Sequence, residues 1–374
     1  MHNPLQVLKH YWGYDGFRPG QAEVIDSILS GHDTLALMPT GGGKSITFQV
    51  PALANPGICL VISPLVALMK DQVKNLQKRG ILSAFISSEM PHWEILQQLD
   101  NCILGDYKLL YISPERISSE LFQEKLKTLS RKVNLLVVDE AHCISQWGND
   151  FRRDYRLIAD IRDAIPHVQV IAVTASATAA VVADICEQLH FRKGYRIFKT
   201  SFERKNLSFV VRKTDNKLKE ICHILSAVPG SAVIYSRTRK GVEEYAGKLR
   251  AAGISAEYFH AGLDPVLKTE RQADWVKGFT RVLVATNAFG MGIDKGDVRV
   301  VIRTELPDSM EAYYQEAGRA GRDGKRAYAV ALLGPQDITD IKRRPSNAFP
   351  TIEYIKRVYE ALCNRFQIAE GDGE

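Results

Sequence analysis

Cysteine is scarce in this chain of 374 residues, and its six cysteines are scattered. None lies close to another along the sequence, so the paired spacing of a zinc-binding motif is absent and we predict no zinc. Several stand in apolar stretches, such as Cys59 between Ile58 and Leu60. This placement predicts buried free thiols in a reducing compartment rather than disulfides.

Long apolar runs are also missing. The longest unbroken one, Ala327 to Leu333, is far too short to cross a bilayer. The first residues, Met1 to Trp12, contain no apolar core of signal-peptide length. We therefore expect a protein that is neither secreted nor bound to a membrane. Its expected location is the cytoplasm, in association with the nucleoid if the source is a bacterium.

No charge of one sign dominates the composition. Charged residues make up 25% of the chain and apolar residues 45%, which is ordinary for a soluble globular protein. The net charge of +6 is compatible with a polyanionic partner, but many enzymes have a similar balance. The length favours two or three domains, each large enough to bury a core.

Short β-rich runs alternate with helical patterns, which indicates parallel sheets flanked by helices. We predict an α/β fold with two lobes, residues 1–204 and 205–345, and then the start of a helical module at residues 346–374. The lobes join in the polar stretch between Lys199 and Asn206. The predicted strands are Thr34–Met38, Cys59–Ser63, Ala84–Ser87, Lys108–Ser113, Leu135–Asp139, Val170–Thr174, Leu207–Val211, Ala232–Ser236, Ala256–His260, Val282–Thr286, Val298–Ile302 and Ala327–Leu332; predicted helices include Ala67–Arg79, Trp93–Leu104, Ile117–Leu129, Ala179–Leu189 and Ile352–Phe366.

A glycine-rich run lies between a strand-like stretch, Thr34 to Leu37, and a helix-like stretch, Ile46 to Leu53. Three glycines followed by a lysine let the backbone curl around phosphates, direct N–H groups at them and place an ammonium on the terminal ones. Met38 stands where the strict phosphate-loop pattern has a glycine, so the prediction depends on the order of strand, turn and helix. The alternative is a flexible loop. The predicted nucleotide-binding residues of this run are Thr40, Gly41, Gly42, Gly43, Lys44 and Ser45.

An acidic pair directly follows the apolar run Leu135 to Val138. Asp139, at the predicted strand end, and Ser45 are expected to hold Mg²⁺, and Glu140 to orient and deprotonate an attacking water. With Lys44, the pair predicts ATP hydrolysis, with ATP and Mg²⁺ as the ligands. The alternative for these two acids is a solvated strand end.

The second lobe has no glycine-rich lysine loop, so we expect it to bind no nucleotide independently. It contains Arg319 and Arg322, three residues apart. We predict that both lie on one helical face and reach a single anionic target. If that target is the γ-phosphate of ATP, at least one of them is an arginine finger, a group that raises hydrolysis by roughly a thousandfold or more. The alternative is two surface arginines on a glycine-rich turn.

These motifs, in this order, resemble the helicase core of the RecQ family of DNA helicases, within superfamily 2, over about residues 10 to 335. The resemblance implies two RecA-like lobes with the ATP cleft between them. Phe17 to Gln21 is similar to the family's motif 0, in which Gln21 reads the adenine, Tyr14 stacks on it and Arg18 assists.

Further segments carry the same resemblance. Thr174 to Thr178, which includes Ser176, is similar to the segment that couples hydrolysis to strand separation. By resemblance Arg322 is the finger, whereas Arg319 helps to bind phosphates. Asp294, at the end of motif V, is expected at the nucleotide. Segments similar to the family's DNA-backbone motifs and to motifs IV and V are Ser63–Leu65, Lys70–Gln72, Ser113–Arg116, Tyr235–Thr238 and Ala285–Asp294.

Cys143 to Tyr155 is similar to the aromatic-rich loop that distinguishes RecQ from its superfamily relatives. Aromatic side chains stack on unpaired bases while neighbouring arginines meet phosphates, and each stacked base contributes ~1–3 kcal/mol. The alternative is that the two aromatic residues belong to the core. The residues expected to bind DNA or to couple it to hydrolysis are His142, Gln146, Trp147, Phe151, Arg152, Arg153, Thr174 and Ser176.

RecQ proteins commonly continue into a four-cysteine zinc site, but here only Cys363 follows the two lobes. Either a helix-rich module replaces the zinc module or the sequence stops short of it. The resemblance implies a monomeric DNA helicase that moves 3′ to 5′ on single-stranded DNA and unwinds forked duplexes in repair and recombination. The alternatives are an RNA helicase, a DNA translocase that separates no strands, and a non-catalytic binding module. The sequence names no protein partner.

Overall fold

The chain divides by its internal contacts into two units. A computed structural model describes residues 3–39, 41–145, 152–175, 177–201, 203–287, 289, 295–307, 309–348 and 351–366. Unit 1 comprises Met1–Asn206, Gly290–Gly296 and Tyr314–Lys325. Unit 2 comprises Leu207–Phe289, Asp297–Tyr313 and Arg326–Glu374. The turn that carries Arg319 and Arg322 is therefore grouped with the glycine-rich loop.

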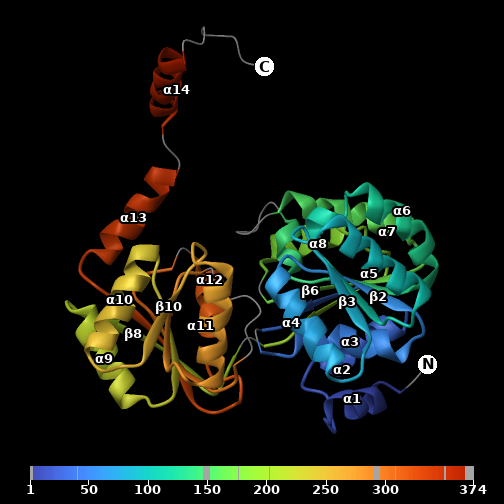
Figure 1. Ribbon diagram of the computed structural model, residues 1–374, viewed down its shortest axis with the longest axis horizontal. Coiled ribbons are helices and arrows are strands. Elements are labelled where there is room, and N and C mark those ends of the chain that lie inside the picture. Colours follow the sequence, from blue (N-terminus) through green and yellow to red (C-terminus); the bar gives the residue numbers. More distant parts are fainter. Residues whose placement is uncertain are drawn as a thin grey trace. The chain divides into compact units, whose positions relative to one another are not determined.

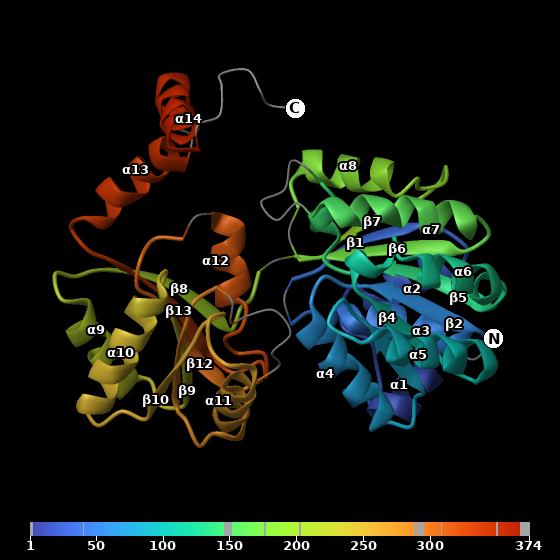
Figure 2. The same cartoon turned by 45° about the horizontal axis from the view of Figure 1, so that its top comes forward.

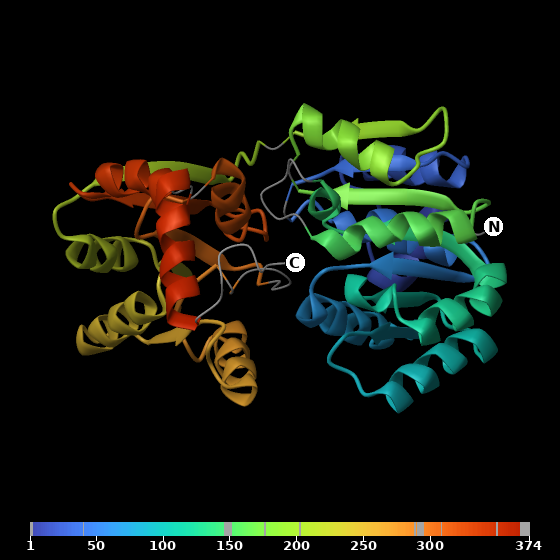
Figure 3. The same cartoon turned by 90° about the horizontal axis from the view of Figure 1, so that it is seen from above.

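Unit 1 contains a seven-stranded sheet in the order β3-β4-β2-β5-β6-β1-β7, and every strand pair is parallel. Figure 3 shows these strands side by side, coloured from blue to green. Parallel strands bring their carboxyl ends to one edge of a sheet, where ligands bind in α/β folds. The strands are β1 Thr34–Leu37, β2 Ile58–Ile62, β3 Ser83–Ile86, β4 Leu109–Ile112, β5 Val133–Val138, β6 Gln169–Thr174 and β7 Arg196–Lys199.

Helices cover both faces of this sheet (Figure 1), which is why its strands are almost continuously apolar. Successive strand residues alternate between the two cores: Leu60 packs with α5 to α8, and Val61 with α1 to α4. The helices are α1 Pro4–Trp12, α2 Gln21–Leu29, α3 Lys44–Ala54, α4 Val66–Gln77, α5 His92–Leu104, α6 Glu120–Leu129, α7 Ile158–Ala164 and α8 Ala179–Gln188.

Unit 2 contains a six-stranded parallel sheet in the order β10-β11-β9-β12-β13-β8. Helices α9 and α10 lie on one side of it, and α11 and α12 on the other (Figure 2). Trp275 of α11 is buried and donates from its indole Nε1 to Ala232 O at 3.2 Å. Helix α12 crosses the division, since its residues from Tyr314 onward belong to unit 1. The elements from the junction onward are β8 Leu207–Lys213, α9 Lys217–Ala227, β9 Ser231–Tyr235, α10 Arg239–Ala251, β10 Ala256–Phe259, α11 Pro265–Lys277, β11 Val282–Ala285, β12 Val298–Arg303, α12 Met310–Ala317, β13 Ala327–Leu333, α13 Asp337–Ala348 and α14 Ile352–Phe366.

The predicted α/β class with two parallel sheets is confirmed, and each predicted strand is present within a few residues. Strand β7 was not predicted, because its sequence Arg-Ile-Phe-Lys is short and mostly exposed at the sheet edge. The helix predicted from Ile117 begins at Glu120, after the 3₁₀ turn Pro114–Arg116. Among the described residues, no helix is long and apolar enough to cross a membrane.

Candidate active site

The glycine-rich loop connects β1 to α3 at the carboxyl edge of the unit 1 sheet. Gly41 and Gly43 have φ values of 80° and 78°, a region that side chains with a Cβ rarely adopt. Gly42 N donates to Pro39 O at 2.9 Å, which closes the turn. Met38, which replaces the first glycine of the strict pattern, is buried and extends β1, since its N–H donates to Thr174 O at 3.0 Å. An apolar side chain at this position therefore serves the core.

Lys44 begins α3 and points to the end of β5. Its Nζ lies 3.4 Å from Glu140 Oε1, and the two side chains are only 14% and 15% exposed. On the other side of the carboxylate, His142 Nδ1 lies 3.5 Å from Glu140 Oε2. The same His142 Nδ1 lies 2.9 Å from Thr174 Oγ1, at the end of β6. Four predicted site residues from three segments thus form one polar chain.

Asp139 lies beside this chain. Its Oδ1 accepts from Glu140 N at 2.9 Å and its Oδ2 from Ser63 Oγ at 3.5 Å. Burial, and then the neighbouring Glu140 carboxylate, raise the pKa of Asp139 to about 6, although Lys44 acts in the opposite direction. The carboxylate therefore lacks sufficient positive charge around it, which is the electrostatic condition that a divalent cation would relieve.

Glu140 itself adopts an unusual backbone conformation. Its φ and ψ are 47° and 48°, in the left-handed region that costs a residue with a Cβ roughly 1 kcal/mol or more. The conformation turns the chain sharply after β5 and is supported by Tyr155, whose hydroxyl donates to Asp139 O at 2.9 Å. Strain of this kind is concentrated at functional sites.

The residues of predicted motif 0 contact the glycine-rich loop directly. Gln21 is buried; its Nε2 donates to Gly42 O and Gly43 O at 3.2 and 3.1 Å, and its Oε1 accepts from Arg18 N at 2.9 Å. The Arg18 guanidinium donates to Gly41 O at 2.7 Å. Tyr14 is 53% exposed. In this structure Gln21 and Arg18 therefore support the loop, and their predicted roles at adenine stay predictions.

The prediction that Arg319 and Arg322 lie on one helical face is wrong. Helix α12 ends at Ala317 and both arginines lie on the turns that follow, because Gly318 interrupts the helix and Gly321 has a φ of 61°. Arg319 is only 8% exposed, and its Nε and Nη1 are buried with no hydrogen-bond partner among the described residues. Buried guanidinium nitrogens without an acceptor are costly, so the absence of one for these two atoms within the described part of the chain favours a role for Arg319 in binding an anion.

Arg322 lies close to the glycine-rich loop within unit 1. A Cβ built on Gly41 would lie 3.5 Å from Arg322 Cγ and 3.7 Å from Arg204 Nη1. Arg204 was not predicted as a site residue. In the sequence Arg204 is an arginine in the polar junction between the lobes, and no motif spacing marks it as a site residue.

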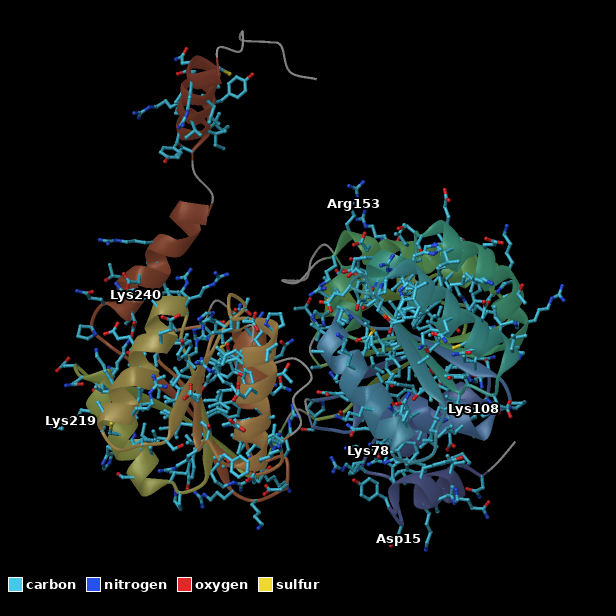
Figure 4. All side chains as sticks on the ribbon, in the orientation of Figure 1. Asp15, Lys78, Lys108, Arg153, Lys219 and Lys240 are labelled. Atoms are coloured by element: carbon cyan, nitrogen blue, oxygen red, sulfur yellow. The ribbon has the colours of Figure 1, made fainter. Side chains whose placement is uncertain are left out.

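Two arginines of the predicted DNA-binding loop are described. Arg152 Nη1 donates to Pro64 O at 3.1 Å, within the predicted DNA-backbone motif Ser63–Leu65, whereas Arg153 is exposed and points outward (Figure 4). Other predicted residues lie outside the described part of the chain, and the structure adds nothing to their assignment: Thr40, Gln146, Trp147, Phe151, Ser176 and Asp294.

The six cysteines are free thiols, and all but the half-buried Cys222 are buried, as predicted. Among the described residues no group of three or more His, Cys, Asp or Glu side chains could hold a metal ion by itself. Ser45 and Asp139 could therefore bind Mg²⁺ only with further ligands, such as phosphate oxygens and waters, which is the usual manner for this ion.

Taken together, the loop offers backbone N–H groups and an ammonium to phosphates. An acid that would bind a metal, an acid beside a lysine and a largely buried guanidinium, that of Arg319, lie in the same unit. Such a set binds a nucleoside triphosphate and can activate water against it.

Two family models match the chain. The DEAD/DEAH box helicase family matches residues 18–185, which contain the glycine-rich loop and the acidic pair. The helicase conserved C-terminal domain matches residues 216–324, which contain the arginine turn.

Curated relatives match both units together. The chain is 43% identical over 341 residues to the ATP-dependent DNA helicase RecQ of Bacillus subtilis, which covers 90% of this chain and 57% of that protein. It is 39% identical over 337 residues to the probable ATP-dependent DNA helicase RecS of the same organism, covering 89% of this chain and 67% of that one. The chain therefore spans little more than half the length of the RecQ protein.

A solved structure has the same fold at low identity. Dbp5 of Saccharomyces cerevisiae, bound to RNA and ADP BeF3, superposes with a TM-score of 0.71 at 19% identity, over 93% of this chain and 92% of that one. At this identity the match supports only the fold, two parallel α/β lobes.

Proposed function

This chain belongs to the RecQ family of superfamily 2 helicases, and on that premise we propose that it hydrolyses ATP to move along single-stranded DNA and to separate the strands of a duplex. The single observation that best supports hydrolysis is the contact of Lys44 Nζ with Glu140 Oε1 at 3.4 Å, at the foot of a glycine-rich loop. Both side chains are largely buried, so this contact differs from the solvent-exposed ion pairs that contribute little to stability.

The residues take distinct roles in this proposal. Gly41 to Gly43 direct N–H groups at the triphosphate, and Lys44 neutralises its terminal phosphates. A phosphate bound there competes with Glu140 for the Lys44 ammonium and leaves the carboxylate able to accept a proton from water. Ser45 and Asp139 would hold Mg²⁺, which when bound neutralises phosphate charge. Arg319, whose Nε and Nη1 have no hydrogen-bond partner among the described residues, binds phosphate, and Arg322 stabilises the charge of the transition state.

Tyr14, Arg18, Gln21, Thr40 and Asp294 complete the proposed nucleotide site. The support for Gln21 and Arg18 is their contact with the glycine-rich loop, through which bound adenine would affect the loop's conformation. The other three assignments depend on the family resemblance.

We assign coupling to DNA to the contacting polar side chains that lead from Glu140 to the end of β6. His142 joins Glu140 to Thr174, so a movement at the nucleotide can reach the end of β6 and the segment after it. Gln146, Trp147, Phe151 and Ser176 are assigned by family resemblance to the same coupling. Arg152, which is held at Pro64, would meet a phosphate of the strand.

DNA is preferred over RNA because the curated relatives are DNA helicases by name. The fold itself does not decide, since Dbp5 is bound to RNA with a similar fold. We further propose 3′-to-5′ movement, forked DNA as a substrate, a monomeric state, a role in repair and recombination, and action in the cytoplasm, where free thiols persist.

ATP turnover tests the proposal. We expect single-stranded DNA to stimulate turnover at least tenfold more than RNA does, and Lys44→Ala to reduce turnover at least ~100-fold because the phosphates lose their ammonium. Lys78→Ala, at an exposed position visible in Figure 4, is the matched lysine control and should behave as the parent protein. Activity that survives Lys44→Ala, or greater stimulation by RNA, would contradict the proposal.

A forked-duplex unwinding assay separates a helicase from a translocase. Release of the displaced strand that depends on ATP and on Lys44 supports the proposal. ATP turnover stimulated by DNA with no strand release would instead support the translocase.

A further inference from the structure

The junction between the two units is tied to the arginine turn. Arg204 donates from its guanidinium to three backbone carbonyls, Gly318 O at 3.4 Å, Ala320 O at 2.9 Å and Gly321 O at 2.6 Å. These carbonyls surround Arg319 and immediately precede Arg322. A guanidinium presents several N–H groups in a fixed plane, so one side chain can fix the shape of a turn through several acceptors.

Asn206 binds the other end of the same turn. Its Nδ2 donates to Gly321 O at 2.8 Å and to Lys325 O at 2.9 Å, and its Oδ1 accepts from Arg204 Nε at 3.3 Å. The two side chains therefore act together, and Gly321 O receives a hydrogen bond from each. Short-range backbone bonds within the turn, such as Ala320 N to Ala317 O at 3.0 Å, close it locally, whereas these two side chains join it to the junction.

Positive charge is concentrated at this place. Burial lowers the pKa of Arg204, and the neighbouring Arg322 and Arg18 lower it further, while Asp323 acts in the opposite direction. Arg18 reaches the same region by its contact with Gly41 O at 2.7 Å. Cations that repel one another stay together only if other contacts hold them, and the carbonyls bound by Arg204 provide such contacts.

We propose that Arg204 and Asn206 are positioning residues, which hold the arginine turn so that Arg319 and Arg322 can meet the phosphates of ATP. This inference rests on the proposed ATPase function and extends it to the junction. Because Arg204 and Asn206 immediately precede β8, the first strand of unit 2, a change in the junction would alter the arginine turn and hence the rate of hydrolysis.

The alternative role for Arg204 is direct contact with a phosphate of ATP. Substitution by lysine distinguishes this role from positioning. Arg204→Lys keeps the charge but cannot serve three carbonyls in one plane. We expect Arg204→Ala to lower kcat by about 10- to 100-fold, as misplacement of a catalytic group does, with the KM for ATP within about threefold. Arg204→Lys should recover less than a third of that loss. Near-complete recovery by lysine would overturn the positioning role.

A double-mutant cycle gives the sharper test. If Arg204 acts through the arginines of the turn, then Arg204→Ala in a background that carries both Arg319→Ala and Arg322→Ala should lower kcat by less than about threefold further. If Arg204→Ala instead lowers kcat in that background by the same factor as in the parent protein, the inference is overturned. Binding of ADP with aluminium fluoride, a mimic of the phosphoryl group in the transition state, should weaken in Arg204→Ala by about the same factor as kcat, whereas ADP alone should bind as in the parent protein. Equal weakening of both would indicate a structural defect and would also refute the role.

Asn206→Ala is the second variant, in case Arg204→Ala does not fold. It removes the two bonds from Asn206 to the turn and the one that Asn206 accepts from Arg204 Nε, and a fall in kcat of about three- to tenfold is expected at an unchanged Tm. Lys205→Ala, an exposed neighbour, is the control that should match the parent. Parental turnover that is abolished by Lys44→Ala establishes the ATPase first. If the parent protein hydrolyses ATP but kcat is unchanged in both Arg204→Ala and Asn206→Ala, only this inference is refuted. If the parent protein does not hydrolyse ATP, the proposed function and the inference fail together.

Discussion

Replacing Asp139 with asparagine removes an ionised carboxylate from a site that raises its pKa to about 6, from an ordinary value of 3.8. Because the pKa in the folded state lies above its unfolded value, ionisation destabilises the folded protein. The destabilisation is absent well below pH 4 and complete above pH 6. Asparagine can still accept from Glu140 N through its carbonyl and donate to Ser63.

The shift gives the size of the effect. At pH 7.5 a shift of about two pKa units corresponds to roughly 3 kcal/mol, and at pH 4.5, where the folded state holds the proton, to roughly 1 kcal/mol. Relative to the parent protein, we therefore expect Asp139→Asn to gain about 2 kcal/mol more free energy of unfolding at pH 7.5 than at pH 4.5.

Urea unfolding of the ligand-free protein at both pH values, followed by circular dichroism, measures this difference. Hydrogen exchange of the β5 amides, compared between variant and parent at the same pH, reports on unit 1 alone. Asp106→Asn, at an exposed position, is the control and should show no such difference between the two pH values. If the gain for Asp139→Asn is the same at both, the carboxylate is not destabilising and the argument for a cation-seeking site is refuted.

Three further predictions concern catalysis and coupling. Glu140→Gln should lower kcat by about 10²- to 10⁴-fold through loss of the base, while fluorescent-nucleotide titration shows ATP affinity within a few-fold; loss of binding would contradict it. Thr174→Val removes the hydroxyl that contacts His142 and should lower the ratio of turnover with DNA to turnover without DNA about tenfold, whereas an unchanged ratio would exclude this route. Trp147→Ala should lose most of the same stimulation through lost base stacking, and equal stimulation in variant and parent would reject the stacking role.

The sequence was sufficient for the fold because hydrophobic periodicity is a direct consequence of burial. Strands such as β2 and β5 are buried on both faces, and their apolar runs were recognised. Strand β7 was missed for the opposite reason, since three of its four side chains are exposed and leave no pattern. The arginine turn was misread as helix because a three-residue spacing also occurs on turns, and only Gly318 and Gly321 signal the difference.

Local sequence could predict that Lys44, Asp139 and Glu140 lie near one another, because each stands at the end of a strand or the start of a helix at one edge of the sheet. It could not reveal that Gln21 holds the glycine-rich loop or that Arg204 holds the arginine turn. Such contacts join residues far apart along the chain, and no spacing rule predicts which side chain will meet which carbonyl.

The left-handed backbone at Glu140 has a consequence for directed evolution. Glycine or asparagine would relax this residue at little steric cost, so a screen that rewards heat resistance alone would favour both substitutions. Either one deletes the acid that we propose takes up the water's proton. Libraries selected for robustness should therefore keep codon 140 fixed, or they will enrich well-folded proteins that no longer turn over.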